Sequence, residues 1–479
     1  MNRLNRRAFL QTAAAPALLA GRPADAPVNV VSIVCDQMRG DAMSFLGHPN
    51  ARTPNLDRMA SEGVVLDRCF VNNPVCVPSR KSCFSGLYPH QHGSLTNSQR
   101  PLLSYSDTLV EHFEKRGYRT GWVGKNHTYE PEAMERLAYK SVRSREPFRA
   151  YNGFVPPHWH GDVYWPEEKC YPQINSDRAV GFLESAKAQE PFFLHVSYFD
   201  PHPPYMAPSD YTSRYRSDQM ALPDYVPADA LSPRLEEFKH AFGMDRATPA
   251  ELTETMRYYY AQIEWGVDKQ VGRLLGALDR LGLSENTVVL FTSDHGDFMG
   301  TNGLVRKGMF LYDSLLHVPM IWRAPGRLPA GVRSKAMAQH IDIFPTLVDF
   351  SGGRPPDRLP GRSLRPLLET PERDPSDREV FTSAGYGELT EATKNLPLDP
   401  RDKNAVPRHT QVLQESMNPE HRCAMIRTAE WKLVRNESRG PELYHMNGGV
   451  VEKTNVADRR EHSGVRRDLE RKLAFWWKW

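Results

Sequence analysis

Four short apolar segments, each followed at once by polar residues, constrain the fold of this 479-residue chain more than any other feature. The segments are residues 28–34, 121–123, 191–199 and 288–292. Runs of Val, Ile, Leu and Phe of this kind are typical of strands buried on both faces of a parallel sheet. Ligands bind beyond the carboxyl ends of such strands, so we expect the polar residues that follow the four segments to share one site.

Helical patterns separate the strand-like segments. Apolar residues recur at helical spacing in 53–63, 106–116 and 251–283. Strands that alternate with helices indicate a doubly wound α/β architecture, with a large, mostly parallel sheet flanked by helices.

The pattern changes after residue 370. Residues 431–435 and 442–444 predict short antiparallel strands, and 468–479 predicts an amphipathic terminal helix. We therefore expect a catalytic domain over 27–370 and a smaller C-terminal α+β domain over 371–479. Within the second, 386–411 is polar and irregular, which indicates a long loop.

Composition and hydropathy argue against a nucleic-acid-binding protein and against a protein that spans the membrane. A hydrophobic content of 40% and a charged content of 25% are those of a globular protein. The net charge of +3 provides no electrostatic basis for binding nucleic acid. No apolar run of about 18 residues follows the N-terminal region, so we expect no membrane anchor of the spanning type.

Residues 1–26 have the pattern of a twin-arginine signal peptide. The sequence NRRAFLQ at 5–11 precedes a mildly apolar stretch at 12–21 and an Ala-Asp-Ala cleavage site at 24–26. The alternative is a basic start to a helix. We expect a bacterial protein whose mature chain begins near Pro27, exported to the periplasm or secreted. No cysteine follows the apolar stretch, so a lipid anchor is not expected.

The residues after the strand-like segments offer metal ligands. Asp36 and Gln37 follow the first segment, and Asp294 and His295 follow the last. Oxygen donors with one imidazole suit a single divalent, mostly hard cation. Either pair alone is more often a helix cap or a turn.

Cys76 begins the sequence Cys-Val-Pro-Ser-Arg, which ends at Arg80 and is expected to form a short polar turn. This string resembles the maturation signal of the type I, formylglycine-dependent sulfatases, a family of the alkaline-phosphatase-like superfamily. Further strings resemble the family's motifs in the family's order, over nearly all of the mature chain. They are TPNLDRMA at 53–60, GLYPHQHG at 86–93, GKNH at 124–127, PHPP at 201–204 and SDHG at 293–296.

The resemblance implies an alkaline-phosphatase-like fold and a chemical role for each matching residue. A formylglycine-generating enzyme would oxidise Cys76 to an aldehyde, whose hydrate attacks the sulfate ester and forms a covalent sulfate intermediate. The other implied catalytic residues are Arg80, which orients the hydrate, Lys125 and Lys307, which bind sulfate oxygens, His202, which protonates the leaving alcohol, and His127, which helps to expel sulfate. The implied metal ligands are Asp36, Gln37, Cys76, Asp294 and His295.

Gln37 and His295 stand where many members of the family carry Asp or Asn. The resulting set is similar to a branch with choline sulfatases and phosphonate monoester hydrolases. Family resemblance favours Ca²⁺, and the imidazole leaves Mn²⁺ and Mg²⁺ as alternatives. The pair Lys125 and His127 favours sulfate over phosphonate. His90, His92 and Asp297 are expected to have structural roles only.

The sequence leaves three alternative hypotheses for the function of the protein. The first is an exported sulfatase that acts on sulfate monoesters, and the second is a phosphonate monoester hydrolase or phosphodiesterase on the same scaffold. The third is an unconverted, catalytically silent protein that binds sulfated glycans. Specificity is expected from 129–165, 207–248 and 386–411, which are rich in aromatic and basic residues and favour a sulfated carbohydrate. The sequence carries no signal of oligomeric state.

Overall fold

The computed structural model describes residues 27–97, 102–141, 160–163, 165–187, 190–223, 235–236, 238–239, 244–372, 378–385, 422–436, 440–446, 452 and 454–477. The predicted signal peptide, 1–26, and the predicted loop, 386–411, lie outside the described residues. Two other segments expected to set specificity, 129–165 and 207–248, are described in part.

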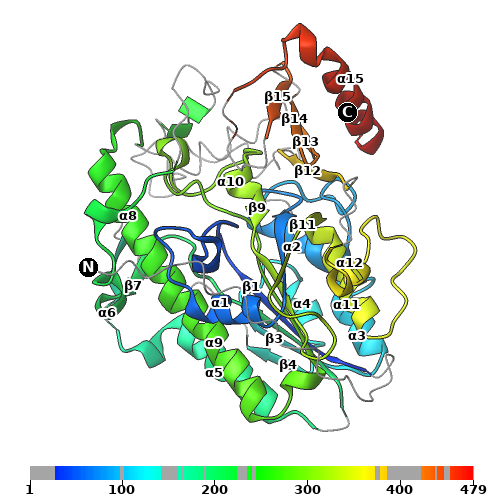
Figure 1. Ribbon diagram of the computed structural model, residues 1–479. Helices are drawn as coiled ribbons and strands as arrows, with labels where there is room; N and C mark the ends of the chain where they lie inside the picture. Colours follow the sequence, from blue (N-terminus) through cyan, green and yellow to red (C-terminus); the bar gives the residue numbers. More distant parts are fainter. Residues whose placement is uncertain are drawn as a thin grey trace, which may run out of the picture.

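A large, mostly parallel sheet forms the centre of the molecule (Figure 1). Its order is β11-β2-β10-β8-β1-β6-β3-β4, and β9 pairs with β2. The bounds are β1 (Asn29–Cys35), β2 (Val64–Phe70), β3 (Arg119–Gly124), β4 (Tyr139–Ser141), β6 (Phe192–Ser197), β8 (Thr287–Ser293), β9 (His317–Val318), β10 (Met320–Arg323) and β11 (Val332–Gln339). Strand β1 is parallel to both neighbours, with Val31 opposite Leu194 and Val289, and the antiparallel strands β9 and β10 make the sheet mixed. The predicted fold class is confirmed.

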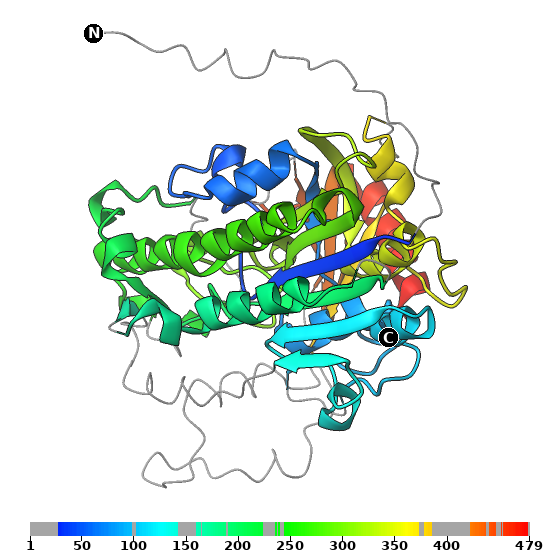
Figure 2. The same cartoon turned by 90° about the horizontal axis from the view of Figure 1, so that it is seen from below.

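Helices cover both faces of this sheet (Figures 1 and 2). One face carries α1 (Pro54–Ser61), α5 (Tyr171–Glu184), α8 (Pro249–Gln262) and α9 (Lys269–Arg280), and the other carries α2 (Cys76–Ser85), α3 (Leu109–Lys115), α11 (Ile343–Phe350) and α12 (Arg365–Glu369). Side chains alternate between the two faces along a strand. Val31 and Ile33 of β1 accordingly join the first core, while Val28 and Val30 join the second.

The single helix predicted over 251–283 is in fact three segments. α8 ends at Gln262, a π-helical turn runs from Ile263 to Asp268, and α9 follows. Residues of this turn make close contacts with other parts of the fold. Its last residue, Asp268, accepts hydrogen bonds from the backbone N–H groups at the start of α1, and a Cβ atom at Gly266 would lie 2.7 Å from Asp200. Tertiary contacts therefore override the continuous apolar pattern.

The C-terminal part forms a second, antiparallel sheet with the order β12-β13-β14-β15. Its bounds are β12 (Val380–Ala384), β13 (Cys423–Arg427), β14 (Trp431–Asn436) and β15 (Glu442–His445). Helix α15 (Ser463–Trp476) packs on it through Leu469 and Leu473, and it begins earlier than the expected residue 468. None of the helices in the described part of the chain has the length and hydropathy that a membrane span requires.

Shorter elements connect these layers. They are η2 (Ser44–Leu46), α4 (Pro131–Met134), β5 (His160–Val163), η4 (Glu167–Lys169), β7 (Tyr205–Pro208), α6 (Ser209–Thr212), η5 (Ser217–Gln219), η7 (Met244–Arg246), η9 (Ser284–Asn286), η10 (Thr301–Gly303), α10 (Asp313–Leu316), η11 (His340–Asp342) and η13 (Arg460–His462). Strands β5 and β7 form a separate parallel pair. Segment 294–312, with η10 inside it, links β8 to α10 and carries Lys307.

Candidate active site

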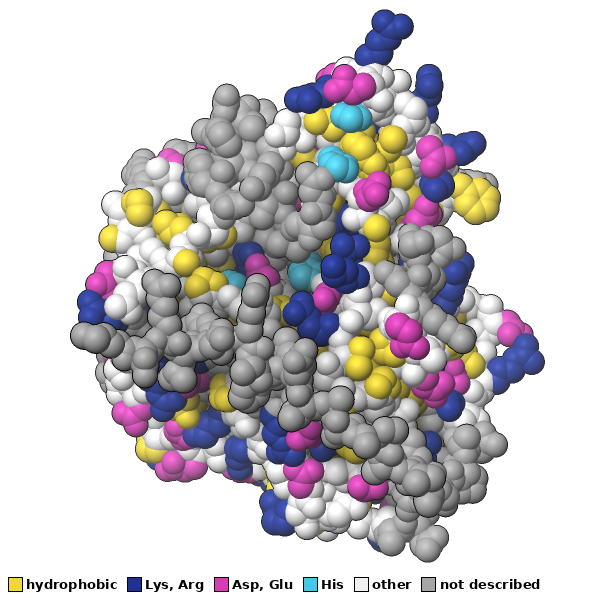
Figure 3. All heavy atoms as spheres, viewed as in Figure 1, with side chains coloured by type: hydrophobic (Ala, Val, Ile, Leu, Met, Phe, Trp, Pro, Cys, Tyr) yellow, Lys and Arg dark blue, Asp and Glu magenta, His cyan; other side chains and the backbone are white. Residues whose placement is uncertain are grey.

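The carboxyl ends of four neighbouring strands of the large sheet carry the polar residues. Asp36 and Gln37 follow β1, and Asp294 and His295 follow β8. Lys125 follows β3, and His202 comes after β6. On the face shown in Figure 3, histidine side chains lie near the centre beside basic and acidic side chains. The parallel register of β1 with β6 and β8 explains why residues far apart in the sequence meet here.

Cys76 reaches this edge from a helix. The sequence predicts a short polar turn at 76–80, but Cys76 is the first residue of α2, and every residue of that helix is buried. The helix is held by hydrogen bonds: the Ser79 hydroxyl donates to the backbone carbonyl of Asp294 at 2.5 Å, and Arg80 Nε donates to Asp294 Oδ2 at 2.7 Å. The polar residues of α2 therefore fix the helix inside the protein. Cys76 lies at the N-terminus of the helix, which carries a partial positive charge.

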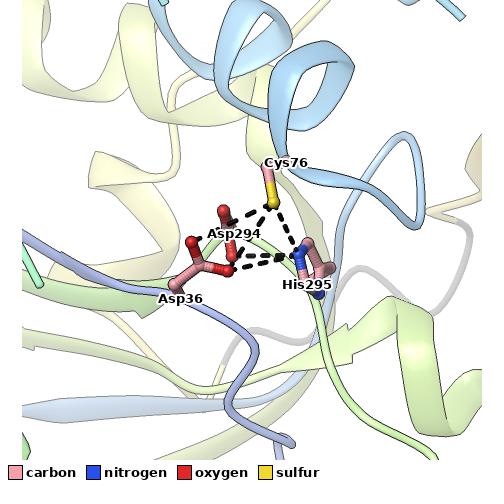
Figure 4. A group of neighbouring side chains, drawn as sticks. All are labelled: Asp36, Cys76, Asp294 and His295. Carbon is pink, nitrogen blue, oxygen red and sulfur yellow. Dashed lines mark hydrogen bonds and ion pairs between the residues drawn. The ribbon is translucent and has the colours of Figure 1, made fainter. Parts of the chain in front are cut away.

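Four side chains form a compact group of metal-ligand type (Figure 4). One ligand atom from each of Asp36, Cys76, Asp294 and His295 lies within 4.8 Å of the others. Cys76 Sγ lies 3.2 Å from His295 Nε2 and 3.6 Å from Asp36 Oδ1. His295 Nδ1 donates to the backbone carbonyl of Gly296 at 2.9 Å, which leaves the Nε2 lone pair for the group.

The buried residue Gln37 lies beside this group. Its backbone N–H donates to Asp294 Oδ1 at 3.1 Å, and its φ of 74° places a non-glycine residue in the left-handed region. The side chain is fully buried, and Oε1 has no hydrogen-bond partner among the described residues. Two carboxylates, one imidazole and an unpartnered amide oxygen fit one divalent cation with a preference for oxygen ligands.

Cationic side chains surround the acidic group. Lys125 forms an ion pair with Asp36, and Arg80 Nη2 lies 3.7 Å from Asp36 Oδ2. Burial opposes ionisation of Asp36, but the charges of Lys125 and Lys307 hold its pKa below the ordinary value. Burial has the larger effect on Asp294 and raises the pKa of that carboxyl.

Cys76 has an unusual electrostatic environment. Burial raises the pKa of its thiol, but Lys125, Lys307 and His295 together lower that pKa well below the ordinary value. Lys307 Nζ donates to Cys76 Sγ at 2.9 Å and lies 2.9 Å from His295 Nε2. The site therefore stabilises negative charge at the side chain of residue 76.

Two histidines are neutral near pH 7. Burial and the charge of Lys125 lower the pKa of His127 to about 4, although the nearby Cys76 opposes this shift. Burial and Lys307 lower the pKa of His202 well below its ordinary value. His202 Nδ1 donates to the carbonyl of Pro203 at 2.7 Å, so Nε2 is the nitrogen left to act on a ligand.

A sulfatase family model matches residues 28–353, which include every one of these side chains. The chain belongs to the sulfatase family. It is therefore a sulfuric ester hydrolase, and its enzyme class agrees with the expectation from the sequence.

Curated sulfatases and a solved structure resemble this one over most of their length. The chain is 32% identical to an ulvan-active sulfatase of Formosa agariphila, with 74% of this chain and 67% of that protein covered. It is 26% identical to an N-acetylglucosamine-6-O-sulfatase of Bacteroides thetaiotaomicron, with coverages of 92% and 84%. The crystal structure of a phosphonate monoester hydrolase of Agrobacterium radiobacter matches with a TM-score of 0.74 at 25% identity, and covers 94% of this chain and 95% of that one.

This sulfatase also contains residues at the site to which the sequence alone assigned no functional role. Ser197 ends β6, and its hydroxyl accepts a 2.7 Å hydrogen bond from Arg80 Nη1. Asp297, expected to have a structural role only, accepts a hydrogen bond from Gln37. The position of Ser197 at the end of a strand could have indicated that it lies at the site. No local sequence pattern could have indicated the contact between Asp297 and Gln37. His90 packs against Trp476 of α15, away from the metal-ligand group.

Proposed function

We propose that this sulfuric ester hydrolase cleaves sulfate monoesters with formylglycine made from Cys76. The observation that carries the proposal is the place of Cys76 at the start of α2, 3.2 Å from His295 Nε2 and 2.9 Å from Lys307 Nζ. The thiol sulfur here marks the position that the reactive oxygen of the converted residue takes. The hydrate supplies an oxygen nucleophile for a covalent sulfate intermediate and a second hydroxyl whose deprotonation releases sulfate.

The surrounding residues have distinct proposed tasks. Lys125 and Lys307 hold sulfate oxygens, whose charge changes during transfer, and Arg80 orients residue 76. A bound sulfate ester adds negative charge near His202 and so favours protonation of Nε2, from which the leaving alcohol takes its proton. His127, neutral and near residue 76, takes the proton that initiates release of sulfate.

Asp36, Gln37, Asp294, His295 and residue 76 would hold one divalent cation, with Ca²⁺ proposed over Mn²⁺ and Mg²⁺. The cation supplies Lewis-acid polarisation of the sulfate and of the nucleophile. Support comes from the buried, closely spaced donors and from the unpartnered Oε1 of Gln37. Metal analysis of protein purified without chelator identifies the ion.

The proposed substrate is a sulfated carbohydrate. Two of the curated relatives are named for activity on a glycan, ulvan, and on N-acetylglucosamine-6-O-sulfate groups. Desulfation of a panel of sulfated mono- and oligosaccharides tests this, and activity confined to small choline-like esters contradicts it.

The decisive test of the chemistry combines mass spectrometry with an assay. In protein from its native host, the peptide that contains residue 76 should carry the aldehyde, and Cys76→Ala should lose turnover of aryl sulfates. Arg354→Met, at a surface pair remote from the site, is the control and should leave turnover unchanged. A fully unmodified thiol with no turnover supports the alternative of a silent glycan-binding protein.

A phosphonate monoester hydrolase is the second candidate. The TM-score of 0.74 with such an enzyme favours it, whereas Lys125, which pairs with Asp36, and the neutral His127 favour sulfate. Parallel measurement of kcat/KM on aryl sulfate and aryl phosphonate esters separates the two, and a higher value for the phosphonate reverses our preference.

We further propose export through the twin-arginine route. The support is the sequence of residues 1–26 alone, and it fits a nucleophile that the maturation enzyme makes before the chain folds. Fractionation of the native host tests it. Replacing Arg6 and Arg7 with lysines should retain the protein in the cytoplasm.

A further inference from the structure

Asp297 is a fully buried carboxylate that none of the proposed chemical steps uses. It lies two residues after His295, and both of its oxygens accept hydrogen bonds. Oδ2 accepts from Gln37 Nε2 at 2.6 Å and from the Tyr205 hydroxyl at 2.7 Å. Oδ1 accepts from the backbone N–H groups of Met299 and Arg306, both at 2.8 Å. A buried charge with four donors is well compensated, so its cost of burial does not argue against a specific role.

The hydrogen bond to Asp297 fixes the orientation of the Gln37 side-chain amide, that is, the directions in which Nε2 and Oε1 point. An ionised carboxylate accepts hydrogen bonds only, so it faces the NH₂ group of Gln37 and turns Oε1 to the opposite side. Oε1 is the atom that is buried without a partner among the described residues. A buried acceptor without a partner is unfavourable, and a bound cation would supply the partner that Oε1 lacks.

The backbone of Gln37 is also held in place. Its N–H donates to Asp294 Oδ1 at 3.1 Å, and its carbonyl accepts from the Tyr259 hydroxyl at 3.1 Å. With the backbone fixed and Nε2 bonded to Asp297, the orientation of the terminal amide decides which atom faces the cation site. A flipped amide would place its carbonyl against Asp297 and its NH₂ group toward the cation site, and both contacts are repulsive.

We propose that Asp297 is a positioning residue that orients the Gln37 amide so that its oxygen, not its nitrogen, is presented to the divalent cation. The inference rests on the proposed cation site. The same carboxylate holds the backbone at 299 and 306, next to Lys307, so one buried charge ties the amide ligand to the loop that carries that lysine.

A double-mutant cycle on cation affinity tests the proposal without reference to turnover. Asp297→Asn keeps the size of the side chain and an oxygen for the loop N–H groups, but it can present a donor to Gln37. We expect Asp297→Asn to weaken Ca²⁺ binding by about 10- to 100-fold in calorimetric titration of the metal-free protein. Gln37→Ala should weaken it by a similar factor, and the double variant by little more than either single change.

The double variant separates orientation from charge. If Asp297 acted only by its negative charge or by holding the loop, its substitution would cost the same with or without Gln37. If the fold-loss of Ca²⁺ affinity in the double variant equals the product of the two single losses, the proposal is wrong. Tyr205→Phe is the matched control, because it removes another donor to Asp297 Oδ2 and leaves the Gln37 contact in place. Its affinity should stay within about threefold of the parent, on the scale of a single buried hydrogen bond.

A second measurement uses the parent protein and does not depend on a variant that folds. In protein labelled with ¹⁵N at glutamine, the side-chain NH₂ of Gln37, assigned by loss in Gln37→Ala, should exchange slowly with solvent and shift on addition of Ca²⁺. Fast exchange with no response to Ca²⁺ would overturn the proposal. Failure of the parent to bind Ca²⁺, Mn²⁺ or Mg²⁺ at all would instead refute the proposed cation site on which it rests.

Discussion

Lys307 Nζ lies 2.9 Å from Cys76 Sγ, although the two residues are 231 positions apart. The lysine comes from the loop after β8, and the cysteine begins α2. The contact places a cation against the group that attacks the substrate in the proposed mechanism. In the proposed mechanism, sulfate oxygens meet this positive charge on the side of residue 76 where His295 Nε2 lies.

Replacing Lys307 with methionine should lower kcat for aryl sulfates by about 10²- to 10³-fold, the usual effect of removing one group that stabilises transition-state charge. Methionine keeps much of the side-chain volume and removes the charge. Steady-state kinetics with saturating substrate measures the effect. Lys335→Met, at an exposed residue of β11, is the control with unchanged kcat. An unaltered kcat in Lys307→Met would remove this lysine from the mechanism.

His202→Asn should make turnover depend strongly on the leaving group. A general acid matters most when the departing alkoxide is basic, so alkyl sulfates should lose about 10²- to 10⁴-fold in kcat/KM. Aryl sulfates with acidic phenols should lose much less. The comparison is His127→Asn, which should lower kcat to a similar value for both ester types and leave kcat/KM nearly unchanged, because His127 acts after the alcohol has left. Equal losses for both esters in His202→Asn would contradict its role as the acid.

His340 should make the fold sensitive to mild acid. Its Nδ1 lies 3.4 Å from Ser79 Oγ of α2 and its Nε2 3.2 Å from Thr292 Oγ1. Burial together with Arg80 lowers its pKa from 6.5 to about 3. Below pH 6.5, His340 therefore binds a proton in the unfolded chain but stays neutral in the folded chain. This difference lowers the free energy of unfolding as the pH falls, by about 2 kcal/mol between pH 6.5 and 5.

Urea unfolding at several pH values measures this dependence. In His340→Gln the free energy of unfolding should fall less steeply over the same interval, by the contribution of one proton. Identical slopes in parent and variant would show that His340 titrates normally in the folded protein. The other buried histidines contribute to both proteins alike, so the difference isolates His340.

Lys432→Met should loosen the attachment of the second sheet. Lys432 of β14 is fully buried and pairs with Glu452 and with Asp313 Oδ1 at 2.5 Å, while Arg427 Nε lies 3.3 Å from Asp313 Oδ2. Removing the lysine leaves Glu452 as a buried, unpaired carboxylate, with an expected loss of about 3–5 kcal/mol. Chemical denaturation measures the loss.

The matched comparison is Arg354→Met, whose pair with Asp357 is largely exposed. Its effect should stay within about 0.5 kcal/mol. A loss below about 1 kcal/mol in Lys432→Met would show that solvent reaches the cluster and screens it, as in surface pairs.

The sequence by itself determined the strands, the alternation with helices and the chemical type of the residues at strand ends. Apolar runs such as 28–34 and 288–292 are read reliably because burial on both faces leaves few other structures for them. The short motifs around Cys76 and Asp294 identified the family, because chemistry restricts residue type at adjacent positions.

Only the tertiary structure decided which oxygens and nitrogens meet. The helix that begins at Cys76 and the break at 263–268 depend on contacts with Asp294, Asn55 and Asp200, residues remote in sequence. The hydrogen bond between Gln37 and Asp297 joins residues 260 positions apart, and no periodic pattern in the sequence predicts it. Local patterns record burial, whereas hydrogen bonds between buried polar groups depend on distances that exist only after the layers have packed.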